Sequence, residues 1–137
     1  MSRLRMLDTD IISYVIKNRS LEIQQRFAEL PPSSLCISTV TRAELLYGLR
    51  RLPPSHPLHF AVRRFLKTIS TLAWDSTAAD YWADIRFHLE KSGNLIGHMD
   101  MMIAAHSLSA GAILVTNNTR HFSRIEAPLI LENWSKS

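Results

Sequence analysis

The sequence predicts an α/β fold, a three-layer α/β/α sandwich around a mostly parallel sheet. Two observations lead to this prediction. Short, continuous apolar runs are typical of strands that are buried on both faces, and they alternate with longer segments of helical periodicity. This alternation favours parallel strands joined by helical crossovers. The chain has 137 residues, so we expect one domain over residues 1–137 with a substantial core.

The first half should begin with a strand that closes on Asp8, after which Thr9 or Asp10 would cap a helix. Ser20 is placed to cap the next helix, which the Pro31-Pro32 pair would end. The expected elements are a strand at 4–7, helices through 11–16 and 20–30, a strand at 35–38, and helices through 38–49 and 55–69.

The second half repeats the alternation. Ser76 or Thr77 is placed to cap a long helix, and two glycines bracket the loop before an Ala-rich helix. The expected elements are a strand at 71–74, helices at 76–92 and 98–108, a buried strand at 112–116, a turn or short helix at 121–122, and an edge strand at 129–131.

The charge balance favours an acidic partner. The formal net charge is +4, and 12 of the 16 basic residues are arginine, whose planar guanidinium suits phosphate. If several acids are committed to an internal metal site, the remaining surface is more basic still, which favours nucleic acid or an acidic protein. The alternative is a basic surface kept for solubility.

No apolar run approaches the ~20 residues that a membrane helix needs. The N-terminus is charged where a signal peptide would be apolar, so we expect a cytoplasmic protein with no membrane contact. Cys36 is the only cysteine; it cannot form an intrachain disulfide, and its apolar neighbours predict a buried thiol.

Four polar side chains are expected to converge. Asp8 and Asn118 follow predicted strands, while Glu44 and Asp100 lie in the first turns of predicted helices. Because open α/β sheets keep their binding crevice at the carboxyl ends of the strands, all four can face one crevice. A set of oxygen ligands without His or Cys at zinc spacing suits Mg²⁺ or Mn²⁺.

Structural alternatives exist for these acids. Asp8 and Asp10 also fit helix-capping acids beside a positive helix end, and Thr41-x-x-Glu44 fits a capping box. Asp80 and Asp84 fall on the polar side of their helix and are predicted to be solvated.

Four motifs, in order, carry a family resemblance over nearly the whole chain. They are Met6-Leu7-Asp8-Thr9-Asp10, Ile37-Ser38-x-Val40-Thr41-x-x-Glu44-Leu45-x-x-Gly48, Gly97-x-x-Asp100-x-x-Ile103-Ala104-Ala105 and Leu114-Val115-Thr116-Asn117-Asn118-x-x-x-Phe122. Together they resemble the PIN-domain family, and most closely the VapC-type toxins of bacterial type II toxin–antitoxin pairs.

The resemblance implies an endoribonuclease that depends on Mg²⁺ or Mn²⁺, cuts structured RNA such as tRNA or rRNA, and is neutralised by a cognate antitoxin. It also implies a homodimer that binds DNA only through the antitoxin. Tyr47, Leu49 and Trp82 are candidate exposed apolar residues for the dimer surface.

By position, Asp8, Glu44 and Asp100 match the three acids of the family's metal site. Asn118 stands where many members have a fourth acid, which weakens the case for a second metal. We expect Asp8 and Asp100 to ligate the metal, and Glu44 and Asn118 to hold its waters. Thr116 would position the same water. Thr9 and Asp10 are supporting residues, with Asp10 a cap or an outer group.

Other functions are possible on the same residues. The Asp8-x-Asp10 pattern also resembles the haloacid-dehalogenase phosphatases, but here Lys91 precedes only Asp100, without the neighbouring acid that the family's acidic pair needs. Another alternative is a catalytically weak PIN module that acts mainly within a DNA-binding toxin–antitoxin complex. The six histidines are predicted to be structural or solvated, with His98 the first to reconsider because it precedes Asp100 by two residues.

Overall fold

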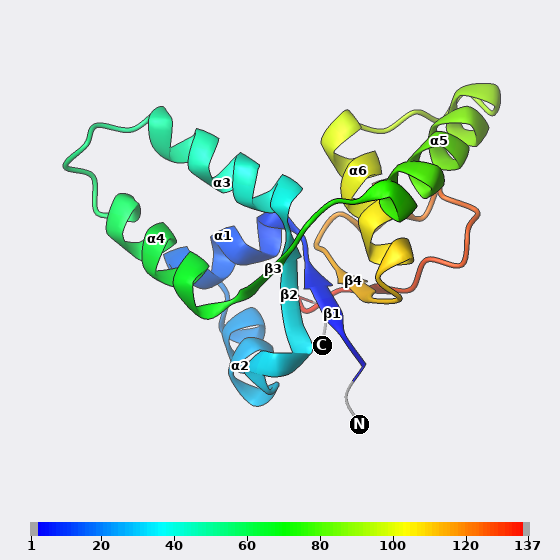
Figure 1. The fold of residues 1–137 in the computed structure, drawn as a ribbon. Coiled ribbons are helices and arrows are strands. Elements are labelled where there is room, and N and C mark those ends of the chain that lie inside the picture. Colours follow the sequence, from blue (N-terminus) through cyan, green and yellow to red (C-terminus); the bar gives the residue numbers. More distant parts are fainter. Residues whose placement is uncertain (1–2, 136–137) are drawn as a thin grey trace.

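The computed structural model describes residues 3–135, so the predicted domain range of 1–137 extends two residues beyond it at each end. In this part of the chain a single five-stranded sheet has the order β3-β2-β1-β4-β5, and every pair of neighbours is parallel (Figure 1). The strands are β1 (Arg5–Leu7), β2 (Leu35–Ser38), β3 (Ser70–Leu72), β4 (Ile113–Val115) and β5 (Leu131–Glu132).

Seven α-helices surround this sheet in residues 3–135, together with one 3-10 turn at Pro32–Ser34. They are α1 (Thr9–Lys17), α2 (Leu21–Glu29), α3 (Thr39–Arg50), α4 (Leu58–Thr68), α5 (Ser76–Lys91), α6 (His98–Ser109) and α7 (Thr119–Phe122). Figure 1 shows α1, α2 and α4 on one side of the sheet and α5 and α6 on the other. The predicted three-layer α/β/α sandwich is therefore confirmed.

The strand side chains divide between the two layers by their alternation. Leu7 and Val115 enter the core beneath α1, α2 and α4, whereas Leu114 enters the core beneath α5 and α6. Successive residues of a strand face opposite sides of the sheet. Both sides are covered here, which explains why these strands are apolar without a break.

Several predicted boundaries are wrong by a few residues. Asp8 itself caps α1, where Thr9 or Asp10 was expected. Asp75 caps α5 by accepting the hydrogen bond of the Ala78 N–H, so the cap precedes the predicted Ser76 or Thr77. The helix expected from residue 55 begins at Leu58, because Pro57 takes the capping position.

Parallel pairing places the carboxyl ends of the strands at one edge of the sheet. Asp8 follows β1, Ser38 ends β2, and Thr116 follows β4 at this edge. The backbone N–H of Asp8 also donates to the carbonyl of Val115 at 2.9 Å. The sheet thus brings together residues more than 100 positions apart in the sequence.

The prediction of a buried thiol at Cys36 is confirmed. Cys36 is 1% exposed, as its apolar neighbours predicted, and burial raises the pKa of its thiol to about 12. No helix within residues 3–135 combines the length and apolar character needed to cross a membrane.

Candidate active site

Asp8 lies at the junction of β1 and α1 and is 5% exposed. Its Oδ1 accepts a hydrogen bond from the Thr9 N–H at 2.8 Å, and its Oδ2 accepts one from the Thr116 hydroxyl at 2.8 Å. Asp8 is therefore both a helix cap and a carboxylate held from two sides. The capping interpretation is correct in geometry, but a cap needs no such burial beside other acids.

The environment disfavours the charge on Asp8. Burial, followed by the charge of Asp10, raises the pKa of Asp8 to about 7, and Asp100 adds to this effect. The hydrogen bonds from Thr116 and Thr9 act in the opposite direction but do not prevail. Buried carboxylates that repel one another gain protons more readily than isolated ones.

Asp10 belongs to the same group of acids. Burial raises its pKa, against the hydrogen bond from the backbone N–H of Asn117. Its Oδ2 accepts the Asn117 N–H at 3.0 Å, whereas its Oδ1 is buried without any hydrogen-bond partner. A buried carboxylate oxygen without a partner is costly, which indicates that a cation or water belongs beside it.

Asp100 approaches these acids from the first turn of α6 and is half-buried. Burial raises its pKa, and the charge of His121 and a hydrogen bond from it counteract the rise. The Asp100 Oδ2 lies 3.8 Å from Nδ1 of His121. Asp100 is thus placed between the buried acids and the short helix α7.

Thr116 and Asn118 form the turn that follows β4. The Thr116 hydroxyl donates to Asp8 and accepts the Asn118 N–H at 2.9 Å. The amide Nδ2 of Asn118 lies 2.8 Å from Nδ1 of His121. Thr116 therefore holds Asp8 directly, while its role in positioning a water stays a prediction. The Asn118 amide group is directed at a histidine.

Glu44 lies in the second turn of α3 and receives a hydrogen bond of 2.5 Å from the Thr9 hydroxyl to its Oε1. Ser38 caps this helix by accepting the Val40 N–H at 3.0 Å. The capping-box interpretation of Thr41 and Glu44 is therefore wrong, because the helix begins earlier. Thr9 links Glu44 to Asp8, since its own N–H donates to the Asp8 carboxylate.

The sequence did not single out the histidine that contacts the acids. His98 is exposed and its Nδ1 lies 3.3 Å from Arg86, so it is not the histidine that contacts the acids. His106 is 3% exposed and contacts the Ser38 hydroxyl at 2.8 Å, a structural role. His121 contacts both Asn118 and Asp100. Its spacing of three residues from Asn118 on a predicted short helix was the available signal.

Asp80 and Asp84 are exposed on α5, as predicted. The structure thus separates the acids into two sets. One set is exposed and solvated, whereas Asp8, Asp10 and Asp100 are close enough to influence one another's pKa.

The donor set fits a hard divalent cation. Within residues 3–135 no Lys or Arg forms an ion pair with Asp8, Asp10 or Asp100. No three His, Cys, Asp or Glu side chains of the described part are gathered tightly enough to enclose a metal as they stand. Mg²⁺ needs no such enclosure, because it usually binds one or two carboxylates and keeps several waters.

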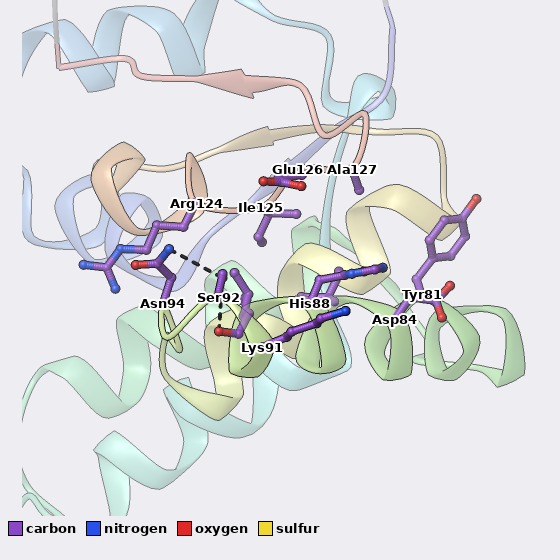
Figure 2. Close-up of a pocket in the computed structure, with 12 residues that line it drawn as sticks. Tyr81, Asp84, His88, Lys91, Ser92, Asn94, Arg124, Ile125, Glu126 and Ala127 are labelled. Carbon is purple, nitrogen blue, oxygen red and sulfur yellow. Dashed lines mark hydrogen bonds between the residues drawn. The ribbon is translucent and has the colours of Figure 1, made fainter.

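Two hollows lie on the described surface. One, of about 570 Å³, lies between α5 and residues 124–127 and contains none of the predicted site residues (Figure 2). Its charged residues are mixed in sign and do not converge: Asp84, His88, Lys91, Arg124 and Glu126. The other, a groove of about 430 Å³, reaches from Thr9 and Glu44 along α1, α3 and α4.

Known proteins resemble this chain over nearly its full length. The family model of the PIN domain matches residues 5–128. Ribonuclease VapC2 of Haemophilus influenzae is 42% identical over 129 residues, covering 94% of this chain and 96% of the relative. The tRNA(fMet)-specific endonuclease VapC of Shigella flexneri is 39% identical, covering 95% and 97%. The crystal structure of DNA-bound VapBC from Salmonella typhimurium contains a chain that is 36% identical, with a TM-score of 0.88 and coverage of 98% and 99%.

Proposed function

The chain belongs to the PIN-domain family, and from this premise we propose that it is the endoribonuclease toxin of a type II toxin–antitoxin pair. The observation that carries the proposal is the meeting of Asp8, Asp10 and Asp100 at the carboxyl edge of the sheet, where no lysine or arginine of the described residues pairs with them and His121 reaches only Asp100. Such a group of acids is costly to keep ionised unless a cation binds it.

The proposed cofactor is Mg²⁺ or Mn²⁺, with Asp8 and Asp100 as its direct protein ligands. The metal would polarise the phosphodiester and stabilise charge on the leaving oxygen. Thr116 keeps Asp8 oriented through its hydroxyl, and Thr9 keeps Glu44 oriented in the same way. Glu44 is thereby placed to orient a water and accept its proton.

Asn118 supports a site for one metal. An amide carries no charge, so the site has one acid fewer than it would with Asp at this position. The Asn118 amide is also directed at His121. The same feature favours the second candidate, a catalytically weak module within a DNA-binding complex. Cleavage of RNA by the isolated chain would decide against that candidate.

Transfer RNA is the substrate that we propose first. The name of the Shigella relative specifies tRNA(fMet), and that relative is 39% identical over nearly the whole chain. The excess of arginine over lysine, 12 to 4, suits binding to RNA phosphates. Ribosomal RNA is the alternative substrate, and sequencing of cleaved RNA ends after brief induction would separate the two.

The groove beside Thr9 and Glu44 is the surface that we propose for the antitoxin. Most of its length is apolar, which suits a protein segment better than a phosphate backbone. Its lining residues are Thr9, Ser13, Ile16, Lys17, Glu44, Leu45, Gly48, Arg51, Leu52, Leu58 and Val62. A chain bound there would end beside the acids and block them. DNA would then be bound by the complex through the antitoxin.

A homodimer remains part of the proposal, but its surface needs one correction. Leu49 is 3% exposed and packs in the core beneath α1 and α4, so it is not available for an interface. Tyr47 is 66% exposed, and Trp82 is half-buried. Of the three residues considered from the sequence, Tyr47 is the strongest candidate.

The proposal is tested by RNA cleavage with purified protein in Mg²⁺ or Mn²⁺. We expect Asp8→Ala and Asp100→Ala each to lower the rate by at least about a hundredfold, since each removes a group that holds transition-state charge in place. EDTA should abolish the activity of the wild type. Activity that survives both EDTA and the two substitutions would overturn the assignment.

The matched control is Asp80→Ala, which removes an exposed carboxylate from α5. It should cleave at the wild-type rate. Circular dichroism of all variants distinguishes loss of chemistry from loss of folding. Co-expression of an acidic antitoxin should restore growth to cells that produce the wild-type chain.

A further inference from the structure

His121 is the one histidine of residues 3–135 that forms an ion-pair contact with an acid of the proposed site. It lies on α7, three residues after Asn118, and its side chain is 42% exposed. Its Nδ1 is 3.8 Å from Oδ2 of Asp100. This separation is shorter than the about 4.2 Å between opposite ligands of one ion with bonds of roughly 2.1 Å. One cation can therefore contact both atoms.

The ring nitrogen that faces Asp100 carries a lone pair. Its neighbour at 2.8 Å is the Nδ2 of Asn118, an amide nitrogen that can only donate a hydrogen bond. In the neutral ring Nδ1 accepts that bond, and the proton is then on Nε2. The Asn118 N–H then occupies the position on the Nδ1 lone pair that a cation would take. A metal that displaces this hydrogen bond can bind Nδ1, because the tautomer with its proton on Nε2 leaves Nδ1 free to act as a ligand.

We propose that His121 supplies a nitrogen ligand to the metal that Asp100 holds, and that this ligand makes the site prefer Mn²⁺ and later transition metals over Mg²⁺. Imidazole is a ligand for transition metals, whereas Mg²⁺ takes oxygen ligands almost exclusively. A site made only of carboxylates lacks this preference for transition metals over Mg²⁺. The inference rests on the proposed metal site, but it predicts which ion that site selects.

The opposing interpretation treats His121 as a cation that only pairs with Asp100. A positive imidazolium would compete with any metal for the carboxylate. Its removal would then strengthen the binding of Mg²⁺ and Mn²⁺ alike. A ligand and a competitor therefore change metal affinity in opposite directions.

The experiment is titration calorimetry of metal-free full-length protein with MnCl₂ and separately with MgCl₂ at pH 8. We expect His121→Ala to weaken Mn²⁺ binding by at least about tenfold, the lower end of what loss of a metal-site partner costs. Mg²⁺ affinity should change by less than about threefold, because Mg²⁺ does not depend on a nitrogen ligand. His121→Asp should strengthen Mg²⁺ binding and reduce the preference for Mn²⁺.

His98→Ala is the matched control, because it removes an exposed histidine from the start of the helix that carries Asp100. It should leave both affinities unchanged. A pulsed electron paramagnetic resonance spectrum of Mn²⁺ bound to the wild type should show coupling to a ¹⁴N nucleus that is absent in His121→Ala. This readout requires no variant to be active.

Equal losses for both ions, no loss, or tighter binding of both would each overturn the role of His121 while leaving the proposed nuclease intact. Absence of ¹⁴N coupling in the wild type would do the same. If the wild type binds neither ion, both the ligand role and the metal-dependent function are wrong.

Discussion

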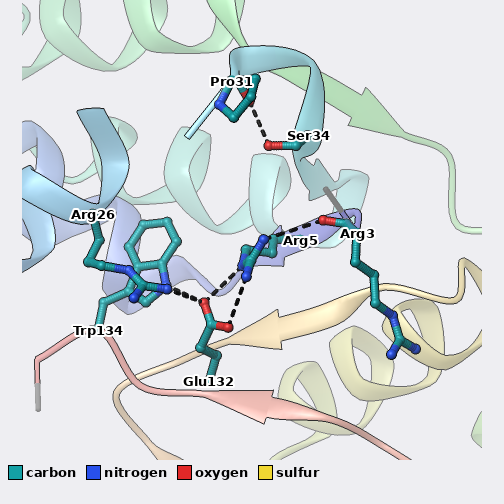
Figure 3. Close-up of polar contacts among 7 residues, drawn as sticks. All are labelled: Arg3, Arg5, Arg26, Pro31, Ser34, Glu132 and Trp134. Carbon is teal, nitrogen blue, oxygen red and sulfur yellow. Dashed lines mark hydrogen bonds and ion pairs between the residues drawn. The ribbon is translucent and has the colours of Figure 1, made fainter. Parts of the chain in front are cut away.

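The carboxylates of Asp8 and Glu132 show two opposite ways of holding an acid within one small fold. Asp8 is buried among other acids, and its pKa is raised to about 7. Glu132, on β5, is surrounded by positive groups (Figure 3). Burial raises its pKa, but the hydrogen bonds from Arg5 and Trp134 and the charges of Arg5 and Arg26 outweigh burial, so its pKa lies below the usual value.

The contacts of Glu132 satisfy nearly all its accepting capacity. Arg5 binds both carboxylate oxygens, at 2.9 and 3.2 Å, and Arg26 binds Oε1 at 3.0 Å. The indole N–H of Trp134 donates to Oε1 at 2.6 Å, and the Arg26 guanidinium lies 5.8 Å from the centre of the Trp134 ring. Trp134 is 2% exposed, so this cluster fastens the C-terminal segment to α2 and β1.

The comparison indicates that one group of charged residues stabilises this fold and a different group forms its proposed site. The Glu132 cluster joins β1, β5 and α2 with paired charges, and it needs no further ligand. Among the described residues, Oδ1 of Asp10 has no hydrogen-bond partner, and no lysine or arginine pairs with Asp8, Asp10 or Asp100. Buried acids that lack neutralising partners are typical of sites that bind a ligand.

The largest expected effect on stability comes from removing the charge of Asp8. In metal-free protein, the raised folded-state pKa means that the folded form holds an extra proton between about pH 4 and pH 7. The free energy of unfolding therefore falls as pH rises through this window and levels off above it. Asp8→Asn has no charge to bury, so it should raise the free energy of unfolding by up to roughly 4 kcal/mol at pH 8.

The measurement is urea unfolding in EDTA at several values from pH 5 to pH 8. The advantage of Asp8→Asn over the wild type should be greatest at pH 8 and shrink toward pH 5. Asp80→Asn, an exposed control, should follow the wild type. A variant that is less stable than the wild type at pH 8 would contradict the strain assigned to Asp8.

Glu132→Gln should lower the free energy of unfolding, which is the opposite of the effect expected for Asp8→Asn, and the change should be smaller. Since the pKa of Glu132 is lowered on folding, its contribution is present above the usual pKa and is lost as pH falls through the folded-state value. We expect a loss of about 1–3 kcal/mol at pH 7, from charge-assisted bonds that a neutral amide cannot replace. The loss should shrink as pH falls below the usual pKa of glutamate and fade once the wild type is also protonated.

Chemical denaturation at pH 7 and pH 3 tests this prediction, with Glu90→Gln as the control because its pair with Arg86 is exposed. RNA cleavage by folded Glu132→Gln should match that of the wild type. A large loss of activity without a loss of stability would mean that the Glu132 cluster contributes to the proposed active site and is not separate from it.

The smallest expected effect is that of Thr9→Val, which keeps the shape of the side chain but removes the hydrogen bond to Glu44. The backbone N–H of Thr9 still donates to Asp8. We expect stability to change by less than about 1 kcal/mol and the cleavage rate to fall about fivefold, the value of one hydrogen bond. Thr77→Val, at an exposed position of α5, should affect neither quantity.

Much of the fold was predictable because its signals are local. The continuous apolar runs at β1 and β4 predicted buried parallel strands, and Ser20 predicted the cap of α2, where it accepts the Ile23 N–H at 3.3 Å. The boundaries of α4 and α5 were not predictable to the residue. Several neighbouring residues can each serve as a cap, and packing selects among them.

The candidate site was predictable in its residues but not in its contacts. The motifs indicated Asp8, Glu44 and Asp100 as the acids and Thr9 and Thr116 as supporting residues. The sequence did not indicate that Thr9 binds Glu44 or that Thr116 binds Asp8, nor that His121 approaches Asp100. Each of these contacts joins segments at least 20 residues apart.

The sequence alone therefore determined the order of strands and helices and the positions of the acids at their ends, because periodicity and capping act over a few residues. Only the tertiary structure decided which acid is neutralised and which is left strained. Parallel crossovers bring Thr116 to Asp8 and Glu132 to Arg5 across more than 100 residues. Charge interactions depend on these distances and on burial, and neither can be predicted from residues that are neighbours in the sequence.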